Sequence, residues 1–297
     1  MDECLLCGSD SRQHIPFEIL IENELEFEYQ ICRSCGLVFR KDLPSNEQLE
    51  AFYLGSYRET VQGQEGPSIK DRWVQEARAR SVVSFLKSHL SHVNKHLDIG
   101  SSSGDLVLQI SREFGCVSIG IEPGDAYREY SSSRGVQVSA SLDDLDSAAV
   151  GTFDLITMSH VLEHLPAPRT YLIELRERWL TEDGSLLIEV PNLFGHPALE
   201  LSHLTAYVPK TIQQLLESAG YETVVLKTHG HPYSRLLKMF ITVLAVPVLD
   251  SRTRESRRPH IRWMKIQRKM GLSILYGARA ISSRLLRKGQ LEPWVGG

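Results

Sequence analysis

The sequence predicts an α/β protein with a doubly wound, mostly parallel sheet, a small cysteine-rich unit before it and a basic helical extension after it. Three observations support this prediction. Two Cys-x-x-Cys pairs lie near the N-terminus. Short apolar segments then alternate with segments of helical periodicity. From residue 229 onward the chain carries 14 Lys and Arg residues against 3 Asp and Glu, although its net charge is −4. The expected domains are 1–45 (cysteine-rich unit), 46–92 (helical linker or lid), 93–228 (α/β core) and 229–297 (basic extension).

The cysteine pairs have the layout of a structural zinc site. Each pair encloses two residues, and 24 residues separate the pairs. Four thiolates fill a tetrahedral site, so the metal would stabilise a unit too small for its own core. Two disulfides or free thiols are the alternative, although disulfides are uncommon in a cytoplasmic chain. The expected zinc ligands are Cys4, Cys7, Cys32 and Cys35.

The residues around these cysteines favour a zinc ribbon. Gly8 and Gly36 follow the second cysteine of each pair, where glycine relieves a tight turn. Residues 17–31 alternate apolar and polar side chains, as strands do. Cys116 stands alone on an expected strand and is interpreted as a buried thiol.

The core alternates strands and helices, which favours a parallel sheet covered on both faces. The expected strands are 96–100, 116–122, 136–140, 153–159, 184–191 and 221–228. The expected helices are 69–90, 105–114, 126–135, 169–180 and 210–220. Ligands of such sheets bind at the carboxyl ends of the strands.

The first core strand ends in "DIGSSSGD", which lacks the dinucleotide fingerprint. Ser102 and Asp105 occupy two of the three glycine positions of that fingerprint. Asp98 would repel a phosphate but suits a cationic amine. Glu122, at the end of the second strand, suits two ribose hydroxyls. A cofactor with a ribose, a positive group and no phosphate is S-adenosylmethionine.

The motifs "LDIGSSSG", "GIEPG", "FDLITMSHVLEHL", "GSLLIEVPN" and "HLTAYVPKTIQQLLESAGYE" together resemble those of class I S-adenosylmethionine-dependent methyltransferases. The resemblance covers roughly residues 93–228 and implies seven strands, the last antiparallel. Ser102 replaces a glycine of that family, a mild change if its backbone angles are ordinary. Ser141 replaces a common Asp that bonds the adenine amine, which implies a weaker bond. The expected cofactor-binding residues are Asp98, Gly100, Ser101, Ser102, Gly104, Glu122, Ser141, Leu142 and Ser159.

Two histidines are candidate general bases for methyl transfer. His160 follows the fourth strand and His203 follows the fifth, on opposite walls of the same cavity mouth. The stretch "SHLTAY" resembles deoxysugar C-methyltransferases with a zinc ribbon, in which a Glu-His pair precedes a leucine. Here Ser202 stands in place of that Glu. We expect His203 to be the base, and a structural histidine in a loop is the alternative.

The segment "SHVLEHL" also matches the H-x-x-E-H zinc pattern through His160, Glu163 and His164. A protease of that class needs both histidines within one helix. This segment instead follows a buried strand directly, so we interpret the match as accidental. Tyr53 and Tyr57, in "YLGSY", could form a lid over the cavity or pack as part of a helix.

The extension predicts an amphipathic helix whose basic residues lie mostly outside an apolar stripe. Contact with an anionic membrane, RNA binding and packing of the stripe against the core are the three alternatives. The longest apolar run, 239–250, is too short to span a bilayer, and the polar N-terminus does not resemble a signal peptide, so we expect a cytoplasmic protein. The stripe consists of Trp263, Ile266, Met270, Ile274, Ile281 and Leu285.

Together these features predict methyl transfer from S-adenosylmethionine to oxygen or carbon of a small molecule, sugar or glycan. An RNA methyltransferase is the first alternative, although "SHVLEH" lacks the Asn/Asp-Pro-Pro-aromatic motif of many base-methylating enzymes. A non-catalytic binding protein that keeps the fold is the second alternative.

Overall fold

The computed structural model describes residues 3–22, 25–43, 66–145, 150–248 and 259–287. The expected lid residues Tyr53 and Tyr57 lie outside this part of the chain.

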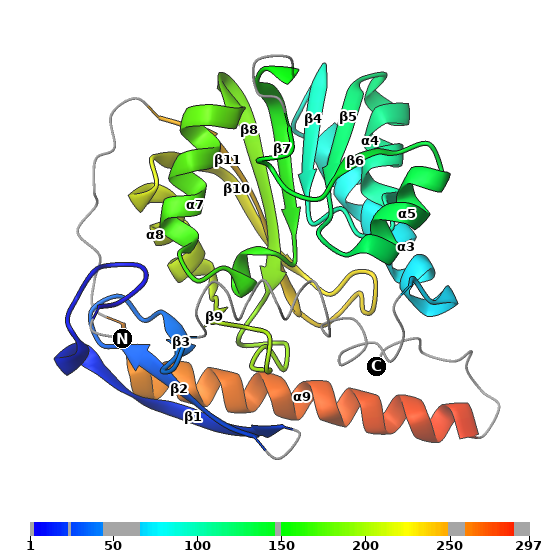
Figure 1. Ribbon diagram of the computed structural model, residues 1–297. Helices are drawn as coiled ribbons and strands as arrows, with labels where there is room; N and C mark the ends of the chain where they lie inside the picture. The colour runs from blue at the N-terminus through cyan, green and yellow to red at the C-terminus, as the bar shows by residue number, and fades with distance from the viewer. Residues whose placement is uncertain (1–2, 23–24, 44–65, 146–149, 249–258, 288–297) are drawn as a thin grey trace.

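A seven-stranded sheet forms the centre of the molecule (Figure 1). Its strand order is β10-β11-β8-β7-β4-β5-β6. All adjacent pairs are parallel except the two that β11 makes with β10 and β8. This arrangement confirms a mostly parallel sheet whose last strand is antiparallel. The strands are β4 Lys95–Ile99, β5 Val117–Ile121, β6 Gln137–Ser139, β7 Phe153–Ser159, β8 Leu180–Pro191, β10 Tyr221–His229 and β11 Phe240–Pro247.

Strand β11 corrects the prediction for the C-terminal part of the chain. The sequence assigned 229–297 entirely to a helical extension, but β11 lies inside the large sheet between β8 and β10. Its first six residues are all buried. A strand that is covered on both faces is continuously apolar and shows no alternation. For this reason the apolar run 239–250 did not indicate a strand by its sequence pattern.

Helices cover both faces of the large sheet (Figure 1). Leu155, Leu187 and Leu244 pack in one cluster with α3 and α4, whereas Ile156 and Leu186 belong to the cluster on the other face. Consecutive strand residues thus point to opposite sides, as the pleat requires. One face carries α3 Ile69–Lys87, α4 Asp105–Phe114 and α5 Asp125–Ser133, and the other carries α7 Pro168–Glu174, a π-helical turn Leu175–Trp179 and α8 Pro209–Ser218.

A second sheet of four strands contains the N-terminal unit and a piece of the core. Strands β1 and β2 confirm the prediction that the alternating residues 17–31 form strands. Strand β3 pairs antiparallel with β9, which comes from the connection between β8 and α8. The predicted boundary between 1–45 and 93–228 is therefore crossed by backbone hydrogen bonds. The strands are β1 His14–Glu22, β2 Leu25–Cys32, β3 Val38–Arg40 and β9 Thr205–Ala206.

Helix α9, Ile261–Arg287, lies along the small sheet and the lower end of the core (Figure 1). Arg268 is 4% exposed; its Nε donates to Glu18 Oε2 at 2.8 Å and its Nη1 to the carbonyl oxygen of Leu193 at 2.9 Å. At Gly271 the helix approaches the backbone so closely that a Cβ would lie 1.6 Å from the carbonyl oxygen of Phe194. The helix therefore docks through its Arg268 and Gly271 face.

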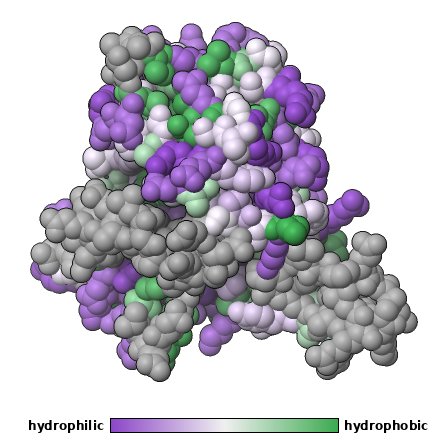
Figure 2. All heavy atoms as spheres, turned by 45° about the vertical axis from the view of Figure 1, so that its right-hand side comes forward, coloured by the Kyte–Doolittle hydropathy of each residue, from purple (hydrophilic) through white to green (hydrophobic). Residues whose placement is uncertain are grey.

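The predicted apolar stripe of α9 lies on the opposite, exposed face. Trp263, Ile266, Met270 and Ile274 are between 45% and 59% exposed. These four residues therefore do not pack against the core. The side chains of Ile281 and Leu285 lie outside the described residues. In the described part of the chain, no helix combines the length and hydropathy needed to cross a bilayer. Figure 2 shows hydrophilic side chains interspersed with smaller hydrophobic areas over the coloured surface.

Candidate active site

A cavity of about 1040 Å³ opens at the carboxyl ends of β4, β5, β7 and β8. Loops after β4 and β5 line one part of it, and loops after β7 and β8 line the other. This is the position where open α/β sheets bind ligands. The volume is at the upper end of what single ligand sites enclose, so it accommodates a cofactor together with a small second molecule.

The loop after β4 is a tight backbone cradle. The backbone N–H groups of Gly100 and Ser101 both donate to the carbonyl oxygen of Ile121 at 2.8 Å. Gly100 has a φ of +75°, and a Cβ at this position would lie 2.4 Å from Cγ2 of Val161. Glycine is therefore required by both the backbone conformation and the close packing.

Ser102 departs from the expectation of ordinary backbone angles, because its φ is +50°. A left-handed conformation costs a non-glycine residue about 1–2 kcal/mol. The replacement of the family's glycine by Ser102 therefore carries a conformational cost. The loop keeps its shape because Ser102 N–H donates to Glu122 Oε2 at 2.8 Å.

Glu122 connects the two loops at the β4 and β5 end of the cavity. It is 2% exposed, and its second oxygen, Oε1, accepts a hydrogen bond from Gly124 N–H at 3.0 Å. Each carboxylate oxygen can accept more than one hydrogen bond. The side chain is thus held rigidly by backbone N–H groups from both loops.

Asp98 is buried at the end of β4 and accepts a hydrogen bond from Thr157 Oγ1 at 2.6 Å. Burial raises the pKa of Asp98 to about 7, against the opposing effect of the Thr157 hydrogen bond. A nearby cation would favour the ionised carboxylate and so lower this pKa. Asp98 is therefore a carboxyl group whose charge state near neutral pH depends on what binds beside it.

Most of the other expected cofactor residues line the same cavity, namely Ser101, Ser141, Leu142 and Ser159. Gly104 does not line it; a Cβ there would lie 2.7 Å from Val136 Cγ2, so this glycine allows close packing. Among the described residues, the hydroxyls of Ser101, Ser102 and Ser159 are buried without a hydrogen-bond partner. Unsatisfied buried hydroxyls around a cavity indicate a polar ligand.

Ser141 is already bonded within the protein. Its Oγ donates to Asp144 Oδ2 at 2.8 Å, and its N–H donates to the same oxygen at 2.9 Å. Asp143 and Asp144 both line the cavity. The sequence analysis did not single out these two carboxylates, although the motif "SLDDL" contains them.

His203 is buried on the opposite side of the cavity. Its Nδ1 lies 2.8 Å from the carbonyl oxygen of Ala198, and its Nε2 lies 3.0 Å from Glu200 Oε1 and 3.9 Å from Glu163 Oε1. Burial alone would lower its pKa, but the carboxylates of Glu200 and Glu163 outweigh burial and raise the pKa to about 9. His203 therefore carries a positive charge at neutral pH.

Glu200 was not recognised from the sequence. It precedes His203 by three residues and accepts a hydrogen bond from Ser202 Oγ at 2.9 Å. The resemblance to deoxysugar enzymes places a Glu directly before the histidine, and Ser202 stands there instead. In this fold the carboxylate beside His203 belongs to Glu200, three residues earlier in the chain.

His160 lies at the end of β7, as expected, and not within a helix. A one-turn 3₁₀ helix, η3 Leu162–His164, begins two residues later. The φ of His160 is +57°, an uncommon conformation that concentrates at functional sites. Its Nδ1 lies 3.3 Å from Glu163 Oε1, and its Nε2 lies 3.4 Å from Glu189 Oε1. Two buried carboxylates therefore orient the ring.

Glu189 is paired by further groups that the sequence analysis did not single out. Arg78 Nε lies 3.1 Å from Glu189 Oε1, and His229 Nε2 lies 3.3 Å from Glu189 Oε2. The pKa of Glu189 is lowered; burial opposes ionisation, but these partners and His160 outweigh it. No motif links these residues, because they come from α3, β8 and β10 and meet only in the folded sheet.

The N-terminal unit holds the connection that carries Glu200 and His203. The Tyr29 hydroxyl lies 2.7 Å from the carbonyl oxygens of both residues and donates to one of them at a time. Arg40 Nη1 donates to the carbonyl oxygen of Leu201 at 2.8 Å, and Arg40 N–H donates to that of Leu204 at 2.9 Å. The small sheet is thus a support for one wall of the cavity.

Comparisons with known proteins agree with this geometry. A family model described as a methyltransferase domain matches residues 71–226. The chain belongs to this methyltransferase family. A solved structure of 1,6-didemethyltoxoflavin-N1-methyltransferase from Burkholderia thailandensis, with bound 1,6-didemethyltoxoflavin and S-adenosylhomocysteine, is 20% identical with a TM-score of 0.54. The similarity covers 78% of this chain and 99% of that chain.

A second solved structure, of a protein from Pyrococcus horikoshii OT3, is 14% identical with a TM-score of 0.50 and covers 65% of this chain and 99% of that chain. At these identities the two structures show a shared fold. No curated protein matches the chain significantly in sequence.

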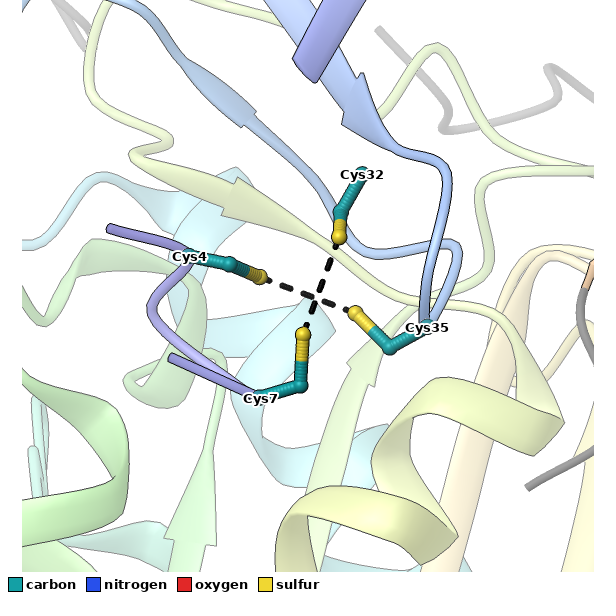
Figure 3. Close-up of side chains that lie close together, drawn as sticks. All are labelled: Cys4, Cys7, Cys32 and Cys35. Atoms are coloured by element: carbon teal, nitrogen blue, oxygen red, sulfur yellow. Dashed lines mark hydrogen bonds between the residues drawn. The ribbon is translucent and has the colours of Figure 1, made fainter. Parts of the chain in front are cut away.

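In this methyltransferase the four paired cysteines converge on one point (Figure 3). The Sγ atoms of Cys4 and Cys35 are 3.6 Å apart, and those of Cys7 and Cys32 are 3.7 Å apart. Sulfur atoms about 2.3 Å from a common metal in a tetrahedron would be about 3.8 Å apart. The spacing fits a four-thiolate metal site, whereas a disulfide would need about 2.05 Å.

The turns around the cysteines match the expected knuckles. Gly8 and Gly36 have φ values of +65° and +86°. Backbone N–H groups of Ser34 and Leu37 donate to the sulfur atoms of Cys32 and Cys35 at 3.4 and 3.5 Å. Cys116 is buried apart from this group, as expected.

Proposed function

We propose that this methyltransferase transfers a methyl group from S-adenosylmethionine to a small, hydroxyl-bearing acceptor such as a sugar or glycan. The observation that carries the proposal is one cavity with two chemically different ends. The β4 and β5 end has a backbone cradle with two buried carboxyl groups, and the β7 and β8 end has histidines paired with carboxylates.

The cofactor end fits S-adenosylmethionine in its donor set. When bound, this cofactor supplies an electrophilic methyl group on a sulfonium. Asp98 would hold the amine, Glu122 would accept hydrogen bonds from the ribose hydroxyls, and Leu142 would lie against the adenine. The unsatisfied hydroxyls of Ser102 and Ser159 add polar contacts to such a ligand. The toxoflavin enzyme with a similar fold contains S-adenosylhomocysteine, which supports this choice.

The acceptor end favours a molecule with several hydroxyl groups, because polar side chains dominate this wall. The toxoflavin enzyme, by its name, methylates a small molecule. An RNA acceptor remains the alternative, and it is an outcome of the experiment below. The polar residues at this end are His160, His164, His196, Glu200, His203 and Tyr233.

His160 is the proton acceptor in this proposal, in place of His203. The sequence favoured His203, but the carboxylate of Glu200 keeps that ring protonated near neutral pH. Nε2 of His160 is buried and makes no hydrogen bond of good geometry within the described residues, and its nearest carboxylate oxygen, Glu189 Oε1, lies 3.4 Å away. Glu163 faces the other nitrogen, an arrangement that orients a base. The charged His203 would stabilise negative charge on the acceptor oxygen.

The cysteine cluster holds zinc in this proposal. Thiolates select zinc among common cellular divalent cations, and the four sulfur atoms leave no open position for catalysis. The metal fixes β2 and β3, which carry Tyr29 and Arg40 to the connection around His203. Zinc would thus act on methyl transfer only through the position of that wall.

The exposed stripe of α9 supports a second proposal, contact with an anionic lipid surface. Arg262 and Lys269 are exposed on the same helix as the stripe of Trp263, Ile266, Met270 and Ile274. An apolar stripe beside basic residues is typical of helices that lie in a membrane interface. A lipid-linked glycan acceptor would account for both this surface and the polar cavity.

Methyl transfer tests the main proposal. The protein is incubated with S-adenosylmethionine that carries an isotopically labelled methyl group, together with either a small-molecule extract or total RNA. We expect label in the small-molecule fraction. His160→Gln should lower turnover about 10²-fold or more, because general base catalysis contributes about this much. His92→Gln, at an exposed position far from the cavity, should leave turnover unchanged.

The two histidines give distinguishable results in this assay. If His203→Gln abolishes turnover while His160→Gln does not, the base is His203 as the sequence first indicated. Label that enters only RNA would overturn the small-molecule acceptor.

Removing one thiolate tests the zinc site. Cys35→Ser should lose bound zinc and lower the melting temperature, because the metal stabilises the small sheet. Cys116→Ser removes a buried thiol elsewhere and should keep the zinc. Metal content by mass spectrometry and thermal unfolding measure both effects. Wild-type protein from zinc-supplemented medium that contains no zinc would contradict the proposal.

Vesicle flotation tests the lipid surface. The protein should float with vesicles that contain phosphatidylglycerol at low salt, and Ile266→Glu should abolish this, because a charge would interrupt the stripe. Ile69→Glu places the same charge at another exposed apolar position, 79% exposed, and should float like wild type. Equal flotation of both variants, or none of the wild type, would exclude α9 as the contact.

A further inference from the structure

Three side chains at the acceptor end form a compact group of metal-ligating types. Glu163 and His164 come from η3, and His203 comes from the connection after β8. One ligand atom from each lies within 4.8 Å of the others. The group contains no sulfur and is separate from the cysteine cluster.

Both histidines of the group are held as metal-ligating histidines usually are. Nδ1 of His164 lies 2.9 Å from the carbonyl oxygen of Ser202, and Nδ1 of His203 lies 2.8 Å from that of Ala198. A carbonyl oxygen can only accept, so each Nδ1 carries a hydrogen, and the lone pair of a neutral ring resides on Nε2. A backbone carbonyl behind the ring is the common second partner of a metal-bound histidine.

Glu163 provides an independent indication of a cation. Its side chain is 1% exposed; Oε1 lies 3.3 Å from His160 Nδ1 and 3.9 Å from His203 Nε2, and within the described residues neither carboxylate oxygen makes a hydrogen bond of good geometry. A buried carboxylate without adequate partners is costly. Glu200 Oε1, 3.0 Å from Nε2 of His203, adds a second carboxylate at the cavity side of the group.

We propose that Glu163, His164 and His203 bind a divalent transition-metal cation at the acceptor end of the cavity. Two imidazoles and a carboxylate suit such a cation, with ligand distances of about 2.0–2.2 Å. Two ligand atoms about 2.1 Å from one cation at a tetrahedral angle lie about 3.4 Å apart, so the three atoms, which lie within 4.8 Å of one another, would move closer on binding. Two members of the H-x-x-E-H segment take part, but the third ligand is His203 and not His160. This site therefore differs from the protease pattern.

The cation would occupy the place where His203 otherwise carries its Nε2 proton. Positive charge would thus be present beside the acceptor both with the cation bound and with His203 protonated. With open positions toward the cavity, the cation could bind hydroxyl or carbonyl oxygens of the acceptor. This role rests on the proposed methyl transfer, whereas the binding site itself does not.

Mn²⁺ is the probe that tests the site, because it prefers carboxylate and imidazole ligands over the thiolates of the cysteine cluster. The full chain with its cysteine metal intact is titrated with MnCl₂, and free Mn²⁺ is followed by electron paramagnetic resonance. We expect about one bound Mn²⁺ per chain. Glu163→Gln, which keeps the size of the side chain, should weaken binding by about tenfold or more.

Glu174→Gln is the matched control, because Glu174 lines the same cavity away from the group and should bind Mn²⁺ like wild type. His203→Asn provides a second ligand variant if Glu163→Gln does not fold. Absence of Mn²⁺ binding by the folded wild type, or equal binding by wild type and both ligand variants, would overturn the proposal. Neither result bears on methyl transfer, which the isotope-label assay tests separately.

Discussion

The backbone pairing between β3 and β9 is the constraint on which the acceptor wall depends. Seventeen residues, 192–208, separate β8 from α8 and contain only the two-residue strand β9. Without the N-terminal sheet, the carbonyl groups of this connection would lack the partners that Tyr29 and Arg40 provide. The cysteine cluster fixes the strand that makes the pairing, and the pairing fixes His203. The proposed structural metal and the proposed acceptor wall are linked in this way.

The two ends of the cavity differ in how they hold charge. Asp98 and Glu122 are buried carboxyl groups tied to hydroxyl and amide donors of the same sheet edge. At the other end Glu163, Glu189 and Glu200 lie among histidines and an arginine. A cationic methyl donor would be favoured at the first end, and at the second the charged ring of His203 would favour an acceptor oxygen that develops negative charge.

Much of the large sheet could be predicted because its strands are short apolar runs between helical segments. Strand β11 could not, since a strand buried on both faces shows no period of two. The apolar stripe of α9 also followed from its spacing, but its exposure did not, because packing of the stripe against the core was one of three alternatives, and the face that does pack was not predicted. That face depends on Arg268, a charged residue whose burial requires Glu18 and a backbone carbonyl from distant segments.

The cofactor side was easier to predict than the acceptor side for a physical reason. Asp98 and Glu122 end neighbouring strands, so their positions follow from the sheet alone. Glu200, Arg78 and His229 reach the site from unrelated elements, and no local pattern marks them. The backbone angle of Ser102 was equally hidden, because the sequence does not record φ.

Binding of S-adenosylmethionine is the most direct test of the central claim that Asp98 and Glu122 form its site. Burial raises the pKa of Asp98 to about 7, and a bound cation would lower it, so affinity should fall as pH falls through this value. Calorimetric titration between about pH 6 and about pH 7.5 should show tighter binding at the higher pH. Asp98→Asn should bind more weakly and lose this dependence. Absence of binding by the wild type, or equal affinity of Asp98→Asn at every pH, would contradict the account.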